Sequence, residues 1–216
     1  MKIEPGTVIT NFDQIEGIYL DILTQMNVNF NTIKRNFVIA EKDRFLEIAE
    51  SYDYSENKAR NLNGFVRYEG GSFNIFIRST RVESLIETVF HEAGHSLVWG
   101  IDKRKGRILE EVLACCFGFW AVEEINKQDY GFRCEDPHKQ LNYRVRIYSK
   151  KNIRENWPVH YAAIKTLDFY RKFFWGGKEL KKGDLVKFID GRSFKDLYSI
   201  LILWAFEEYF DHKNMG

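Results

Sequence analysis

The stretch RVESLIETVFHEAGHSLVWG runs from Arg81 to Gly100. Its apolar residues recur at steps of three and four, which predicts an amphipathic helix; they are Val82, Leu85, Ile86, Val89, Ala93 and Leu97. Thr80 and Glu83 have the spacing of a capping box, so the helix is expected to begin there. Gly100 suits the position after its last turn.

His91 and His95 lie on the polar face of this helix. Residues four apart differ by about 40° in direction, so both imidazoles can reach a single ion. Glu92 points about 100° further round, where a carboxylate serves as a base rather than as a ligand. We therefore predict that His91 and His95 bind Zn²⁺ and that Glu92 is the catalytic general base. The alternative is two ordinary histidines on an amphipathic helix.

Two glutamates in RILEEVLACCFGFW are candidates for the third ligand that a catalytic zinc requires. We choose Glu111, because its helix face continues through small residues that can pack on Ala93 and Gly94; these are Ala114, Cys115 and Gly118. Glu110 is the alternative. Cys115 and Cys116 are expected to be core thiols, since adjacent helical residues cannot face one ion.

The remaining pattern favours an α+β fold. Residues 64–78 contain two alternating β-prone runs around Gly70 and Gly71, which predicts a hairpin in a small antiparallel sheet. Its second strand, Ser72–Arg78, is expected at the sheet edge, where an extended peptide could pair with it. Helices are expected over residues 13–26 and 107–126, and in most of the chain after Gly131.

The hairpin, the HEAGH helix and the following glutamates resemble the zincin group of zinc metallopeptidases, most closely the ImmA/IrrE-like gluzincins. The resemblance covers about Gly64 to Val122 and rests on short motifs. In that family a hairpin leads into the HExxH helix, and a glutamate on the next helix is the third ligand. It implies a cytoplasmic enzyme that hydrolyses a peptide bond in a protein substrate with metal-activated water.

The HEAGH motif is also similar to that of the FtsH-type AAA proteases, whose third ligand is a distant aspartate. Asp168 would take that position here. The surrounding residues do not match that family, and the sequence contains no Walker A loop. Two other functions stay open: a zincin-like binding or regulatory protein with little protease activity, and a helical interaction protein without a metal.

We expect residues 1–130 to form the catalytic domain and residues 131–216 a helical extension packed on it, or one continuous domain. His160 and Tyr161 are candidates to stabilise an oxyanion, although boundary packing is the ordinary role for such residues. The hydrophobic content of 44% is that of a compact globule. No signal peptide or membrane-spanning run is expected, and three cysteines without a CxxC pair favour a reducing cytoplasm.

Residues 138–187 hold 13 basic and 4 acidic residues. Such a run most often forms a solvated helical face. As a functional hypothesis, we assign Lys150, Lys151 and Arg154 to the recruitment of an acidic or regulatory protein substrate. Nucleic acid is not favoured, because no known binding motif accompanies the charge. The sequence gives no prediction of the oligomeric state.

Overall fold

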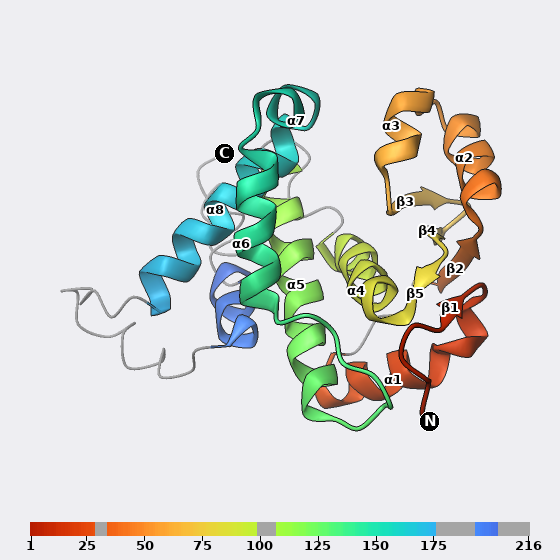
Figure 1. Ribbon diagram of the computed structural model, residues 1–216, viewed down its shortest axis with the longest axis horizontal. Helices are drawn as coiled ribbons and strands as arrows, with labels where there is room; N and C mark the ends of the chain where they lie inside the picture. The colour runs from red at the N-terminus through yellow and green to blue at the C-terminus, as the bar shows by residue number, and fades with distance from the viewer. Residues whose placement is uncertain (29–33, 99–106, 176–192, 203–216) are drawn as a thin grey trace.

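The computed structural model describes residues 1–28, 34–98, 107–175 and 193–202. It is an α+β fold with a small sheet and a mostly helical content, as predicted (Figure 1). The helices are η1 (Phe12–Gln14), α1 (Glu16–Gln25), α2 (Lys42–Ser51), α3 (Glu56–Asn61), α4 (Val82–Val98), α5 (Arg107–Lys127), α6 (Pro137–Tyr148), α7 (Lys151–Asn156) and α8 (Pro158–Trp175). Residues 194–202 are also helical.

The main sheet has three strands in the order β2–β4–β3. β2 (Lys34–Ala40) runs parallel to β4 (Ser72–Arg78), and β3 (Gly64–Glu69) runs antiparallel to β4, so the sheet is mixed rather than antiparallel as expected. The expectation that Ser72–Arg78 forms an edge strand is therefore wrong, since β4 is central. The physical reason is that Ile75 and Phe76, which face opposite sides of the sheet, are both buried. Apolar residues on both faces are typical of an interior strand.

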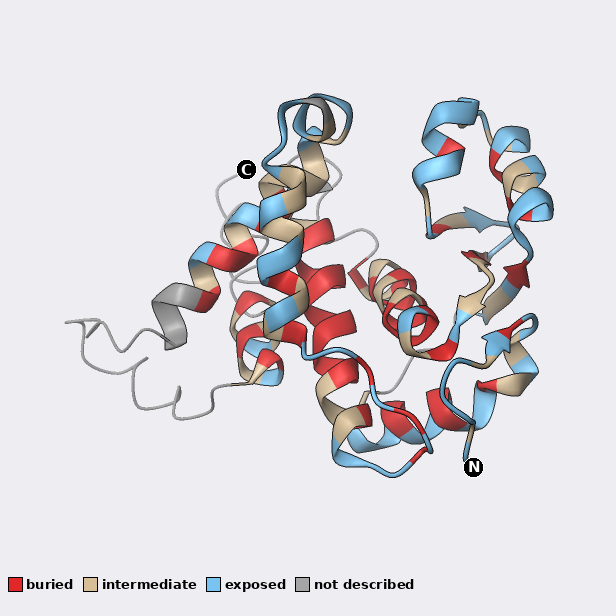
Figure 2. Cartoon of the chain, viewed as in Figure 1, coloured by how far each residue is buried: buried red, intermediate tan, exposed pale blue. Residues whose placement is uncertain are grey.

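A helix layer covers each face of this sheet. On one face, α2 and α3 enclose a small cluster that includes Phe45, Ala59 and Phe65. On the other face, α1, α4 and α5 contribute to the main core, which also takes in α8 and residues 194–202. Figure 2 shows the buried residues concentrated on α4 and α5. No helix within the described residues is long and apolar enough to cross a membrane.

The N-terminal segment organises the start of α4. β1 (Val8–Ile9) pairs with β5 (Thr80–Arg81), so Thr80 belongs to a strand. The Val82 N–H donates to the carbonyl oxygen of Thr7 at 2.9 Å. The Glu83 carboxylate accepts a hydrogen bond from Gly6 rather than completing the expected capping box. Gly100, the expected end of the helix, lies outside the described residues.

Small residues allow α4 and α5 to approach closely. A Cβ atom on Gly94 would lie 3.0 Å from the Cα of Ala114, and one on Gly118 would lie 3.2 Å from the backbone oxygen of Glu87. This close packing is the one expected from the small residues that follow Glu111. It brings side chains of α5 against the polar face of α4.

Candidate metal centre

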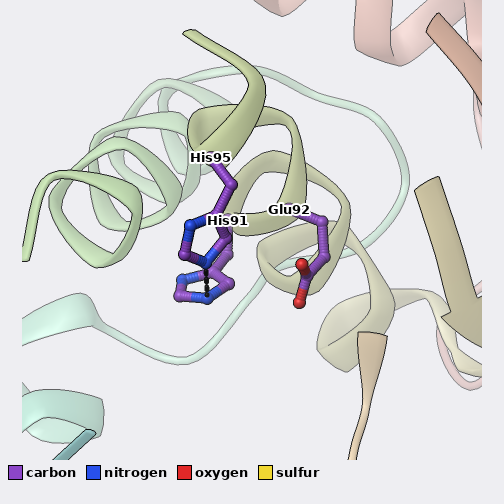
Figure 3. Close-up of side chains that lie close together, drawn as sticks. All are labelled: His91, Glu92 and His95. Carbon is purple, nitrogen blue, oxygen red and sulfur yellow. Dashed lines mark hydrogen bonds between the residues drawn. The ribbon is translucent and has the colours of Figure 1, made fainter. Parts of the chain in front are cut away.

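The imidazoles of His91 and His95 converge on one point. One turn of α4 separates the residues, and their Nε2 atoms are 3.2 Å apart (Figure 3). The side chain of His91 is 12% exposed and that of His95 is 16% exposed. Burial lowers the pKa of His91 to about 3, so its imidazole is neutral, the form that binds a metal.

Glu111 reaches the same point from α5. Its Oε1 lies 3.6 Å from His91 Nε2, and its Oε2 lies 3.5 Å from His95 Nε2. In a tetrahedral zinc site with bonds of about 2.0–2.1 Å, neighbouring ligand atoms are about 3.3–3.4 Å apart. The spacing and the chemistry of these three donors therefore fit zinc.

Glu110 contacts the other side of the His95 ring. Its Oε1 lies 3.0 Å from His95 Nδ1. A proton on Nδ1 can be donated to this carboxylate, which leaves the lone pair of Nε2 directed towards His91 and Glu111. The geometry distinguishes the two glutamates that the sequence left open: Glu111 lies near the Nε2 atoms of both histidines, and Glu110 contacts Nδ1 of His95.

The carboxylates also affect the protonation of the cluster. Burial acts to lower the pKa of His95, but hydrogen bonds to Glu110 and Glu111 raise it well above its ordinary value. Burial acts to raise the pKa of Glu111, but the neighbouring His91 and His95 hold it below its ordinary value. In the absence of a cation, a proton is thus retained between His95 and the two glutamates. The carboxylates therefore favour positive charge at this position.

Glu92 is buried beside the two imidazoles and directed to the same side of α4 (Figure 3). Burial raises the pKa of its carboxyl group to about 8. The first residue of β3 packs against it, because a Cβ atom on Gly64 would lie 2.8 Å from Glu92 Cγ. Glycine at this position therefore leaves room for the carboxylate between α4 and the sheet.

A cavity of about 290 Å³ is lined by His91, Glu92 and Glu111. Its walls come from the α3–β3 connection, α4, α5 and the helices α6 to α8; the residues include Asn63, Gly64, Tyr148, Ile153, Trp157 and His160. His160 Nε2 lies 3.6 Å from Glu111 Oε1. Tyr161 does not line this cavity, and its ring instead lies beside the guanidinium group of Arg154. Of the two candidate oxyanion donors, the structure brings only His160 to the cluster.

The two neighbouring cysteines have different surroundings. Cys116 donates to the backbone oxygen of Phe194 in the core. Cys115 donates to Glu111 Oε1 at 3.7 Å, and a ligand atom from each of Cys115, His91 and Glu111 lies within 4.8 Å of the other two. Both thiols are buried in the core, as expected, but the proximity of Cys115 to His91 and Glu111 was not predicted. The available signal was its i,i+4 spacing from Glu111.

The structure removes one expected residue from the site, Asp168, and adds two others, Arg144 and Glu87. Asp168 forms a buried ion pair with Arg171 on α8. Within the described part of the chain, two groups have ligand atoms within 4.8 Å of one another, His91 with Glu92 and His95 and His91 with Glu111 and Cys115, and Asp168 belongs to neither. Arg144, from the basic stretch, lines the cavity instead of lying on the surface, and pairs with Glu87. Sequence reasoning missed both residues of this pair, because they are far apart in the chain.

Comparison of the chain with protein-family models, with curated proteins and with solved structures found no match.

Proposed function

We propose that this chain is a zinc-dependent metallopeptidase of the zincin type, most like the ImmA/IrrE-like gluzincins, which hydrolyses a peptide bond in a protein substrate. The observation that carries the proposal is the convergence of His91, His95 and Glu111 beside the buried carboxylate of Glu92. His91, Glu92 and Glu111 line a cavity. The β3–β4 pair that precedes α4 also supports it. A cytoplasmic location fits the three free, buried cysteines.

Each side chain has a distinct task in this mechanism. When bound, zinc supplies a Lewis acid that polarises a carbonyl group and lowers the pKa of water. His91, His95 and Glu111 would hold it. Glu92 takes a proton from the attacking water and passes it to the leaving amine. His160 can donate a hydrogen bond to the substrate oxygen as negative charge develops on it.

The sheet offers a path for an extended substrate. In the described part of the chain, β3 pairs only with β4, so its other edge is open to a further strand. β3 begins at Gly64, in contact with Glu92. A peptide paired with this edge would pass the general base. This assigns to β3 the substrate-binding role first expected for β4.

One observation favours the alternative of a metal-binding regulatory protein with little turnover. The thiol of Cys115 lies close enough to His91 and Glu111 to offer a fourth ligand. A fourth protein ligand would occupy the position that a catalytic zinc leaves open. Activity and the effect of Cys115 on zinc affinity therefore separate the two functions.

Removal of the metal tests the proposal directly. The purified protein is expected to cleave members of a library of proteome-derived peptides, with the products identified by mass spectrometry. Dialysis against a chelator should abolish cleavage, and one equivalent of Zn²⁺ should restore it, because the residues of the chain supply a base but no Lewis acid. Cleavage that persists in zinc-free protein would contradict the metal mechanism.

We further propose that the exposed cations of the α6–α7 region recruit an acidic protein substrate. Lys150, Lys151 and Arg154 are exposed and flank Ile153, which lines the cavity. Changing these three residues to glutamate should slow capture of an acidic substrate, most strongly at low salt, where screening is weakest. Stopped-flow measurements at two salt concentrations would show the difference.

A short neutral peptide provides the control for this variant. Its turnover should be unchanged, since the three side chains do not belong to the metal cluster. Equal losses on both substrates would indicate a folding defect, and no loss on either would make these charges a solvated surface.

A further inference from the structure

We infer that Arg144 and Tyr148 form a subsite that binds a carboxylate group of the substrate beside the metal centre. The two residues are four apart on α6 and therefore lie on one face of the helix. Both line the cavity that contains His91, Glu92 and Glu111. The inference rests on the proposed peptidase function and deepens it, because it names the chemical class of substrate.

Both residues of the ion pair between Arg144 and Glu87 line the cavity, and the arginine is the more exposed of the two. The Arg144 side chain is 28% exposed, whereas that of Glu87 is 7% exposed. Glu87 uses Oε2 for the arginine, and its Oε1 is buried near Gly118 of α5. A ligand in the cavity therefore meets the guanidinium group more readily than the Glu87 carboxylate, which is less exposed and already paired with Arg144.

Most of the hydrogen-bonding capacity of Arg144 is available. Among the described residues, Glu87 alone accepts a hydrogen bond from its guanidinium group, which has five N–H donors. The ring of Phe119 lies 5.3 Å from the guanidinium carbon and supports the group from α5. An arginine held in this way matches the two oxygens of a carboxylate.

Tyr148 supplies a second donor on the same wall. Its ring is nearly parallel to that of His160, with an interplanar angle of 7° and centroids 6.2 Å apart. Burial raises the pKa of its hydroxyl group to about 12, so the proton is retained for donation. His160 also contacts Glu111, so the wall of the subsite continues into the metal cluster.

The other charges around the cavity are accounted for by existing contacts. Glu111 faces the two histidines, and Glu87 faces Arg144. Glu92, directed beside the histidines, is the remaining carboxylate, and a bound Zn²⁺ would offset it. The carboxylate of the ligand can come from an acidic side chain next to the cleaved bond or from the C-terminus of a peptide.

Two matched pairs of substrates distinguish these sources. The first pair of peptides differs only by Glu or Gln next to the cleaved bond, and the second only by a free or amidated C-terminus. The parent should prefer one carboxylate by roughly tenfold or more in kcat/KM, from the usual strength of a charge-assisted hydrogen bond. The pair that shows the preference identifies the source.

The variant for this test is Glu87→Gln with Arg144→Gln, because removing Arg144 alone would leave Glu87 buried without its partner. The preference should fall to near unity in the double variant. Tyr148→Phe should reduce it partly. Arg146→Gln, which removes an exposed arginine from the same helix, should leave it unchanged. An unchanged preference in the double variant, or none in the parent, would overturn the subsite.

A binding measurement separates this inference from the proposed function. Metal-free protein is titrated with acetyl-glutamate amide or acetyl-glutamine amide, and the arginine side-chain signals are followed by nitrogen-15 NMR. Saturable shifts should occur with the glutamate compound only and should be absent in the double variant. Such binding without any peptide cleavage would leave the subsite and reject the peptidase. Cleavage without carboxylate binding or preference would reject the subsite and leave the peptidase.

Discussion

Replacing Glu92 with glutamine is expected to lower kcat/KM by about 10²–10⁴-fold, the usual contribution of a general base, while zinc stays bound. The substitution removes the proton acceptor and leaves His91, His95 and Glu111 in place. It should also leave the fold intact. Burial raises the pKa of Glu92 to about 8, so the uncharged form, which glutamine resembles, is favoured in the metal-free protein at neutral pH.

Peptide cleavage and zinc content are measured on the same preparations of parent and variant. Glu123→Gln provides a matched control, because Glu123 is partly buried on α5 and burial raises its pKa to about 7. This control should keep both activity and zinc. Parental activity in the Glu92→Gln protein would reject the assignment of the base. A comparison of cellular proteins after expression of the two forms would also identify the natural substrate.

The local part of the site could be predicted from the sequence. The spacing of His91, Glu92 and His95 on a helix fixes their relative directions through helical geometry alone. The stripe of apolar residues indicated which face of that helix is buried. Small residues after Glu111 indicated close packing of the next helix, and Gly94 and Ala114 are in contact there.

Features that depend on contacts between distant segments could not be predicted in this way. β2 contains the exposed Lys34 and Val38, and only its parallel pairing with β4 makes it part of the sheet. Arg144 belonged to a run of basic residues whose sequence gives no sign that one member turns inwards to Glu87. His160 could be named as a candidate, but its distance from Glu111 depends on how α8 packs against α5.

A series of ligand variants is expected to rank the contributions to zinc affinity. His91→Ala with His95→Ala should bind no stoichiometric zinc, because two of three ligands are lost. Glu111→Ala should weaken binding more than Glu110→Ala. A partner that orients a ligand typically contributes 10–100-fold in metal affinity, which is the loss expected for Glu110→Ala. Competition with a chromophoric chelator would give each dissociation constant.

Two further variants make this ranking informative. Glu124→Ala, further along α5 and outside the cavity, should retain the parental dissociation constant. Cys115→Ser should also retain it if the fourth position is open, whereas a loss as large as that of Glu111→Ala would make the thiol a ligand and favour the regulatory function. A larger loss for Glu110→Ala than for Glu111→Ala would exchange their roles. The ranking therefore tests separately which side chains bind zinc, which orient a ligand, and whether a position remains for the substrate.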